Sequence, residues 1–219
     1  MSKFSVVFDM DGVLFDTETV ALKSWITVGE RHGYTGIEPV AFNCIGRSTK
    51  DTIAIFQSAY PDADIPSLLV ECVDEFKRII SAEGLTLKTG VRELLEWLKA
   101  NGIKTAVASS TNKHGVLSNL RMSGLDGYFS VVFGGDTVEN SKPDPEIYQK
   151  ACAALDEPPQ SCFAVEDSNN GIISASRAGM RPILVPDIVE NTDEVKALAE
   201  KQFKDLLEVR DYFEKELQR

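Results

Sequence analysis

The sequence predicts an α/β protein, in which a parallel β-sheet with flanking helices is interrupted once by a block of helices. Residues 4–8 form an apolar run that ends in two aspartates. Residues 16–84 then show helical periodicity without a strand, and strand and helix patterns alternate over residues 85–219. Such alternation is typical of a parallel sheet with right-handed crossovers. We therefore expect an α/β core at 1–15 and 85–219 and an inserted helical subdomain at 16–84.

The opening strand, residues 4–8, leads directly into Asp9, Asp11 and Gly12. Its residues are too apolar for a strand with one solvated face, so we expect a central strand that is buried on both sides. The two aspartates are two residues apart and therefore point the same way, and Gly12 allows a sharp turn. Asp9 and Asp11 are either solvated turn residues or a buried pair of carboxylates that needs a cation. The apolar run favours the second interpretation, a Mg²⁺ site for an anionic substrate at the carboxyl end of the strand.

The inserted segment is expected to contain three or four helices. Helical periodicity covers residues 17–33, 48–60 and 67–83. Pro61 separates the second helix from the third, and Pro66 lies just ahead of the third.

The remaining core elements follow in alternating order. The expected strands are residues 104–108, 131–133, 162–165 and 182–185. The expected helices are one between Gly90 and Gly102, one ending at Met122, residues 145–155 and 171–178, one after Asn191 and a last one from Leu206. Glu93 is placed to cap the first of these helices, and Asp144 to cap the helix that begins at Pro145.

Further polar residues follow these strands. They are Ser109 and Ser110 after the second strand, Lys142 in a proline-bounded turn after the third, and Glu166 with Asp167 after the fourth. The carboxyl ends of parallel strands meet at one edge, so we expect these side chains beside the two aspartates of the first strand. Each has a simpler explanation, as a helix cap or a solvated loop residue. Together they supply the groups that phosphoryl transfer needs.

The composition excludes several classes of partner. A net charge of −11 argues against nucleic acid and anionic membranes, which need basic patches. No apolar segment is long enough to span a membrane, and no signal-peptide pattern is present. The cysteines lack Cys-x-x-Cys spacing, so we expect free buried thiols in a reducing compartment instead of a zinc site or disulfides. We expect a cytoplasmic monomer.

Four motifs resemble those of the haloacid dehalogenase-like superfamily, in order and at suitable spacing. They are Asp9-Met10-Asp11-Gly12-Val13, a strand ending in Ser109, Lys142-Pro143, and Glu166-Asp167-Ser168-x-x-Gly171. The stretch from Ser141 to Tyr148 is similar to the branch that holds sugar-phosphate phosphatases and β-phosphoglucomutases. The resemblance implies a Rossmann-like core with an α-helical cap, and the expected insertion at residues 16–84 matches that cap in position and length.

The resemblance also implies a mechanism. Asp9 attacks phosphorus and forms an aspartyl-phosphate, since a carboxylate ionised at neutral pH needs no base. Asp11 protonates the leaving oxygen and then takes a proton from water. Mg²⁺ is held by Asp9, the backbone carbonyl of Asp11 and Asp167, with Glu166 bound directly or in the surrounding shell.

The same resemblance assigns the phosphate-binding groups. Ser109, the amide of Ser110 and Lys142 hold the phosphoryl oxygens, next to a helix N-terminus. The expected substrate is a small phosphorylated metabolite, a sugar or polyol phosphate. Its identity depends on the helical cap. Residues 46–48 form a cap loop, and Arg47 or Lys50 contacts a second group of the substrate; alternatively, both are ordinary surface residues.

Phosphatase activity is the first hypothesis and a β-phosphoglucomutase is the alternative. In the mutases a histidine soon after the first motif controls the second aspartate, whereas residues 19–25 contain no histidine. His32 is expected to cap a helix C-terminus and His114 to face solvent. A dehalogenase lacks the second aspartate, so Asp11 argues against that class. A catalytically silent binding protein is the remaining alternative, which a turnover assay with p-nitrophenyl phosphate and Mg²⁺ distinguishes.

Overall fold

The computed structural model describes residues 4–45, 47 and 49–218. The chain divides into two compact units, one made of Met1–Phe15 with Leu87–Arg219 and the other of Asp16–Thr86. The first unit is the α/β core, and the described residues of the second form helices and no strand. The second unit ends two residues beyond the expected boundary at residue 84. That it serves as a cap stays a prediction.

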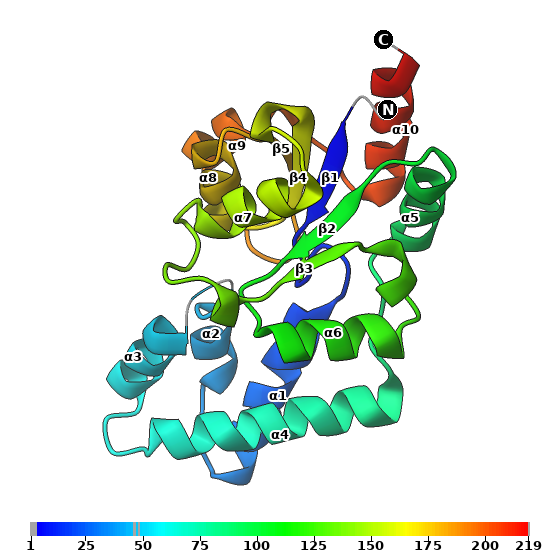
Figure 1. Ribbon diagram of the computed structural model, residues 1–219. Helices are drawn as coiled ribbons and strands as arrows, with labels where there is room; N and C mark the ends of the chain where they lie inside the picture. Colours follow the sequence, from blue (N-terminus) through cyan, green and yellow to red (C-terminus); the bar gives the residue numbers. More distant parts are fainter. Residues whose placement is uncertain (1–3, 46, 48, 219) are drawn as a thin grey trace. The chain divides into compact units, whose positions relative to one another are not determined.

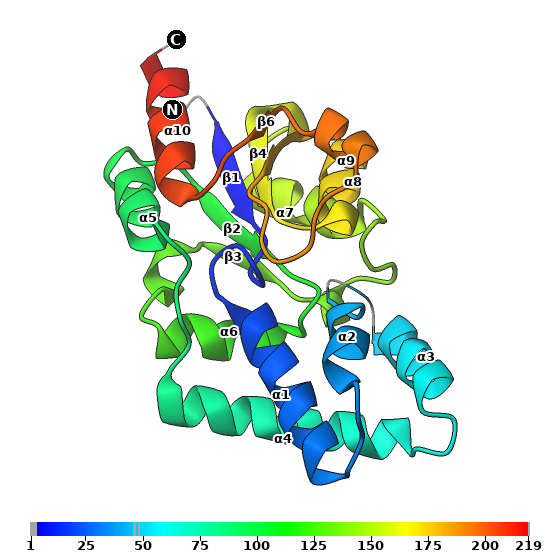
Figure 2. The ribbon, with the colours of Figure 1, turned by 180° about the vertical axis from the view of Figure 1, so that it is seen from behind.

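The core unit contains one parallel sheet within the described residues (Figures 1 and 2). Its strands are β1 (Ser5–Phe8), β2 (Thr105–Ala108), β3 (Val131–Phe133), β4 (Cys162–Glu166), β5 (Arg181–Leu184) and β6 (Lys201–Gln202). The order across the sheet is β3-β2-β1-β4-β5-β6, and every neighbouring pair is parallel. The first strand is central and fully buried. These features confirm the predicted α/β fold class.

Helices cover both faces of this sheet (Figures 1 and 2). They are α5 (Val91–Ala100), α6 (Lys113–Met122), α7 (Glu146–Leu155), α8 (Asn169–Arg177), α9 (Asp193–Leu198) and α10 (Leu206–Gln218). On one face Val7 of β1 packs in a buried cluster with Tyr148 of α7 and Ala175 of α8. On the other, the ring of Phe213 in α10 lies 4.8 Å from that of Phe163 in β4. The central strand is thus shielded from water on both sides.

Two predicted helix caps in the core unit differ from the structure. Gly90 does precede α5, in the left-handed conformation (φ +87°), but among the described residues no side chain forms a hydrogen bond that caps this helix, so the capping role of Glu93 was wrong. In a capping box the side chain of the third helical residue accepts a hydrogen bond from the backbone N–H of the N-cap residue. The left-handed backbone of Gly90 does not have the geometry that this contact with Glu93 requires. Helix α7 begins at Glu146, one residue later than expected, and Asp144 accepts a hydrogen bond from the amide of Glu146 at 3.0 Å.

The helical unit contains α1 (Thr17–Arg31), α2 (Ile37–Phe42), α3 (Thr49–Ala59) and α4 (Ile65–Glu83). Helix α4 starts earlier than predicted, because Asp64 caps it and Pro66 is tolerated in its first turn. Trp25 and Phe56 stack in the unit's own core, with ring centroids 3.9 Å apart.

The loop at residues 46–48, which was expected to influence substrate choice, is described only in part. Arg47 donates to the carbonyl of Asn43 at 2.6 Å. Gly46 and Ser48 lie outside the described residues.

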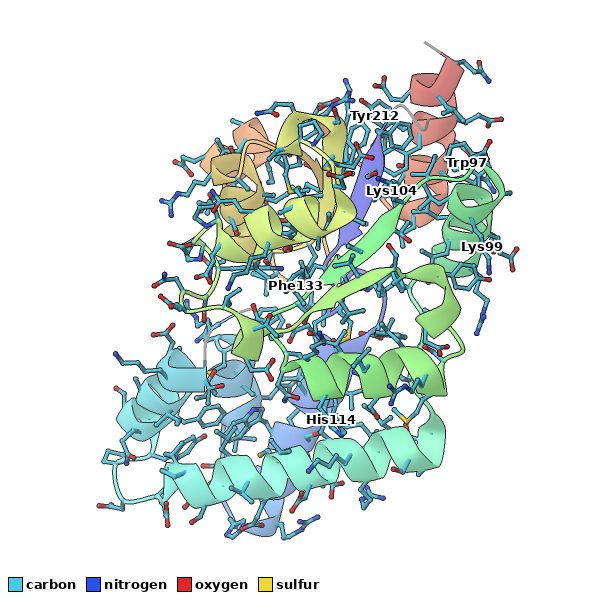
Figure 3. All side chains as sticks on the ribbon, in the orientation of Figure 1. Trp97, Lys99, Lys104, His114, Phe133 and Tyr212 are labelled. Atoms are coloured by element: carbon cyan, nitrogen blue, oxygen red, sulfur yellow. The ribbon has the colours of Figure 1, made fainter. Side chains whose placement is uncertain are left out.

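Several smaller expectations are confirmed. His32 follows α1 as its C-cap and contacts Glu71, and the side chain of His114 is exposed in the first turn of α6 (Figure 3). The four cysteines, Cys44, Cys72, Cys152 and Cys162, are buried and form no disulfide. None of the described helices has both the length and the apolar character that a membrane span requires.

Candidate active site

The candidate site is built at the carboxyl end of β1. Asp9 immediately follows this strand and continues its ladder, because its amide donates to the carbonyl of Val165 in β4 at 2.9 Å. The residue is buried. Its carboxylate therefore sits where the central strand ends, within the protein and not in a solvated turn.

Lys142 provides the positive charge at this site. Its Nζ lies 2.6 Å from Oδ1 of Asp9 and 2.6 Å from Oε1 of Glu166, and it donates to the carbonyl of Ala108 at 2.9 Å. The side chain is only 6% exposed. Burial acts to lower the pKa of Lys142, but the two carboxylates outweigh this and raise it. Lys142 is thus a buried, charged partner of Asp9, and the interpretation as a solvated loop residue is wrong.

The pKa of Asp9 departs from the ordinary value of an aspartate side chain. Burial raises the pKa of Asp9 to about 8, with Glu166 and Asp11 adding to this effect and Lys142 opposing it. Burial thus works against the ionised form of Asp9, and Lys142 works in its favour. A metal ion beside Asp9 would favour the ionised form further.

The donor set fits a hard divalent cation. One oxygen each from Asp9, Glu166 and Asp167 lie within 4.8 Å of one another. Carboxylate oxygens are the ligands that Mg²⁺ prefers, and a cation there would offset the cost of burying Asp9. The side chain of Asp11 is not part of this group among the described residues. That Asp11 offers its backbone carbonyl to the ion stays a prediction.

The Asp11 carboxylate is held by two hydroxyl groups. Its Oδ2 accepts hydrogen bonds from Ser109 Oγ at 3.1 Å and from Thr111 Oγ1 at 2.8 Å. Ser109 is fully buried, and Asn112 is the residue that caps α6. The explanation of this serine cluster as a helix cap is therefore wrong. Ser110 has an exposed side chain, and a role for its amide stays a prediction.

Glu166 is the most enclosed of the acids. It is fully buried at the end of β4, where Oε1 accepts from Lys142 and from the hydroxyl of Tyr148 at 2.5 Å. A Cβ atom at Gly171 would lie 1.9–2.0 Å from the Glu166 carboxyl group, so only glycine fits there. Ser168 is the N-cap residue of α8, so the interpretation of this segment as a helix cap is correct for Ser168. Glu166 is still part of strand β4.

Sequence reasoning missed three residues at this edge of the sheet. Thr111, which contacts Asp11, lies directly after the two serines that the sequence analysis singled out. Tyr148 lies on the buried face of α7, and its spacing from the other apolar residues of this helix is that of an ordinary core residue. Asp187, paired with Lys88, follows β5. An acid after a buried strand, the pattern that indicates Asp9, is therefore also present at Asp187.

Comparisons with known proteins agree with this arrangement. The family model described as "Haloacid dehalogenase-like hydrolase" matches residues 6–185. A phosphorylated carbohydrates phosphatase of Thermotoga maritima is 36% identical over 196 residues, which cover 90% of each chain.

Solved structures are also similar. The CbbY protein of Rhodobacter sphaeroides, solved in complex with phosphate, has a TM-score of 0.78 at 27% identity, covering 95% of this chain and 96% of that one. A β-phosphoglucomutase of Clostridium difficile has a TM-score of 0.76 and covers 100% of both chains, but at 20% identity it shows the fold alone. The match over residues 6–185 confirms the predicted hydrolase class, and the chain belongs to the haloacid dehalogenase-like hydrolase family.

Proposed function

We propose that this chain is a Mg²⁺-dependent phosphatase of a small phosphomonoester and that the phosphoryl group passes through an aspartyl-phosphate on Asp9. The observation that carries the proposal is the buried Asp9 carboxylate, which is paired with Lys142 at 2.6 Å and clustered with Glu166 and Asp167. The phosphatase of Thermotoga maritima, which acts on phosphorylated carbohydrates, supports a sugar or polyol phosphate as substrate.

The first half-reaction transfers the phosphoryl group to the protein. An oxygen of Asp9 forms a bond to phosphorus as the bond from phosphorus to the leaving oxygen breaks, and Asp11 donates a proton to that oxygen. In the free protein Ser109 and Thr111 donate to Oδ2 of Asp11, which leaves Oδ1 to carry the proton. With substrate bound, Thr111 keeps this contact, while the hydroxyl of Ser109, Lys142 and the amide of Ser110 bind the phosphoryl oxygens.

The second half-reaction returns Asp9 to its starting state. Asp11, now a carboxylate, takes a proton from water as the water oxygen attacks phosphorus and the bond between phosphorus and Asp9 breaks. Asp9, the Asp11 carbonyl and Asp167 would hold Mg²⁺, with Glu166 bound directly or through water. The ion supplies positive charge beside the phosphoryl oxygens and keeps Asp9 ionised. Free phosphate and the alcohol are the products.

A mutase differs only in what accepts the phosphoryl group. Residues 19–25 contain no histidine to restrain Asp11, so we expect water to be the acceptor. The test is incubation with β-glucose 1-phosphate, with and without a bisphosphate primer, while glucose 6-phosphate and free phosphate are both followed. Release of free phosphate is expected; fast, primer-dependent formation of glucose 6-phosphate would favour the mutase. A panel of sugar, polyol and nucleotide phosphates then identifies the substrate.

The cell compartment and assembly are part of the same proposal. Four buried cysteines without a disulfide support a reducing compartment, the cytoplasm. We propose a monomer, which a light-scattering measurement at working concentration tests.

A further inference from the structure

One buried acid has no role in the chemistry above. The side chain of Asp187, which follows β5, is only 8% exposed. Its Oδ1 forms an ion pair with Nζ of Lys88. Its other oxygen, Oδ2, is buried and has no hydrogen-bond partner among the described residues. A buried carboxylate oxygen is costly to leave without a donor, so its position calls for a partner such as a bound water or a cation.

The unpartnered oxygen faces the turn that follows Asp11. Gly12 has φ +76°, and a Cβ atom there would lie 2.2 Å from Oδ2 of Asp167 and 3.2 Å from Oδ2 of Asp187. Both carboxylate oxygens therefore approach the same side of the Gly12 backbone. Asp167 belongs to the three-carboxylate cluster with Asp9 and Glu166. Asp187, which follows the next strand of the sheet, thus lies beside Asp167 and just outside this cluster.

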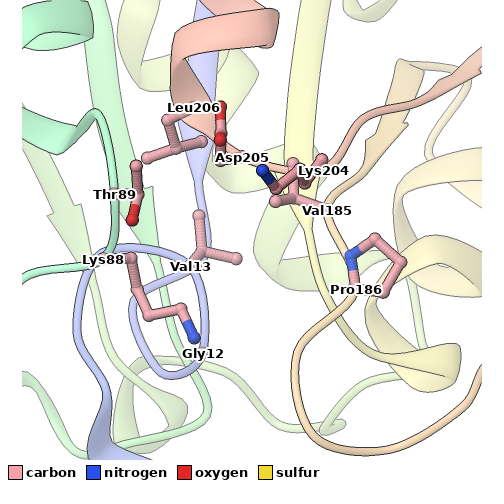
Figure 4. A pocket seen from close by; sticks show the side chains of 9 residues that line it. All are labelled: Gly12, Val13, Lys88, Thr89, Val185, Pro186, Lys204, Asp205 and Leu206. Atoms are coloured by element: carbon pink, nitrogen blue, oxygen red, sulfur yellow. The ribbon is translucent and has the colours of Figure 1, made fainter.

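Lys88 holds Asp187 from the opposite end of its carboxylate. Lys88 and Gly12 line a cavity of about 230 Å³ together with Val13, Val185 and Pro186, and Figure 4 shows the Lys88 amine directed at the Gly12 turn. The amine contacts Oδ1 and leaves Oδ2 free of it. The ion pair therefore fixes the orientation of the carboxylate without supplying a donor to the oxygen beside Asp167.

We propose that Asp187 is a positioning residue for the divalent cation, and that its Oδ2 accepts a hydrogen bond from a water molecule bound to that cation. This inference rests on the proposed function, because it takes the cluster of Asp9, Glu166 and Asp167 as the metal site. Groups that bind metal-bound water fix its orientation and strengthen metal binding through their charge. Lys88 keeps Asp187 in place for this task.

The test is Mg²⁺ affinity, measured by calorimetric titration of the metal-free protein. Asp187→Asn keeps the size of the side chain and an oxygen for Lys88, but it removes the charge and puts an amide beside Asp167. We expect Mg²⁺ to bind roughly 10- to 100-fold more weakly. The matched control is Glu190→Gln, which makes the same charge change three residues away on a side chain that is 90% exposed and pairs with Lys196 at 3.4 Å. It is expected to bind within about twofold of the unchanged protein.

The outcomes separate the two claims. If the unchanged protein binds no Mg²⁺, the proposed function fails and this inference fails with it. If it binds Mg²⁺ and Asp187→Asn binds it within about threefold, or weakens no more than the control, only the role of Asp187 is overturned. Should Asp187→Asn fail to fold in circular dichroism, the double variant Lys88→Met/Asp187→Leu replaces the pair by uncharged side chains at constant net charge. The same loss of affinity is then expected, and an unchanged affinity overturns the inference.

Discussion

Lys142 Nζ lies 2.6 Å from Oδ1 of Asp9, although 133 positions separate the two residues in the sequence. Asp9 comes from the central strand and Lys142 from the loop before α7, so the contact exists only when the sheet is assembled. The same amine lies 2.6 Å from Glu166 of β4. A single cation thus compensates carboxylates from two adjacent strands, and the folding of the core and the chemistry of the site depend on the same contacts.

Lys142→Met is expected to destabilise the metal-free protein by about 3–5 kcal/mol, because it leaves buried carboxylates without their partner. Lys196→Met is a suitable control, since Lys196 pairs with the exposed side chains of Glu190 and Asp193. The control should cost at most about 1 kcal/mol. Urea denaturation in EDTA measures both. Equal stability of the two variants would show that Lys142 does not offset the free-energy cost of burying the carboxylates.

The stability of the metal-free protein should depend on pH through Asp9. Burial raises the pKa of Asp9 from its ordinary value of 3.8 to about 8. Between these values the folded form keeps a proton that the unfolded chain has released, so stability falls as pH rises from about 4 to about 8. Asp9→Asn cannot lose this proton and should show a shallower fall. Thermal melting in EDTA across this range, on both proteins, provides the comparison; parallel curves would contradict the raised pKa.

Metal binding should accordingly release a proton near neutral pH. A cation requires the ionised form of Asp9, which in the metal-free protein is the minor form below about pH 8. The apparent Mg²⁺ affinity should therefore rise between about pH 6 and pH 8 and level off above that. Titration calorimetry in buffers with different heats of ionisation counts the protons. An uptake of protons, or none, would be inconsistent with this account.

Gly171→Ala should disturb the site through a single methyl group. The new Cβ would fall within 2.0 Å of the Glu166 carboxyl oxygens, so Glu166 has to move away from Lys142 and Tyr148. We expect a stability loss of about 1–3 kcal/mol and weaker Mg²⁺ binding. Gly127→Ala serves as the control, because a Cβ there meets nothing within 4 Å. Wild-type metal affinity in Gly171→Ala would mean that the position of Glu166 is unimportant.

Thr111→Val removes one of the two hydroxyl groups that hold Asp11. In the free protein the carboxyl group then keeps only its bond from Ser109, and with substrate bound it becomes free to turn away from the leaving oxygen. Since general acid–base catalysis typically contributes 10²–10⁴-fold, we expect kcat to fall by about 10- to 100-fold, with little change in the melting temperature. Thr111→Ser retains the hydroxyl and should recover most of the activity. Failure of the serine variant to recover it would assign the effect to packing.

Much of the fold follows from local patterns, and the exceptions have physical reasons. The buried run at residues 4–8 predicted the central strand, and strand–helix alternation predicted the parallel sheet. Helix α2 was missed because its six residues, with a proline at position 39, are too short to show periodicity. Strand β6 consists of two exposed residues, Lys201 and Gln202, whose pairing is set by β5 and not by their own sequence.

The candidate site was predictable to the level of residue type. Acids and hydroxyls directly after buried strands indicated Asp9, Ser109 and Glu166 without knowledge of their neighbours. The contacts of Tyr148 and Asp187 were not predictable, because each depends on a partner brought close by the fold. The raised pKa of Asp9 was not predictable either, because it depends on how deeply the folded protein buries this carboxyl group.

The stereochemical course at phosphorus tests the central claim most directly. A thiophosphomonoester made chiral at phosphorus with two oxygen isotopes is hydrolysed by the enzyme with Mg²⁺ in water enriched in the third isotope, and the configuration of the chiral thiophosphate released is read by ³¹P NMR. Each in-line displacement inverts the configuration, so passage through an aspartyl-phosphate on Asp9 predicts overall retention. Overall inversion would show a single displacement by the acceptor and would contradict the role of Asp9 as nucleophile.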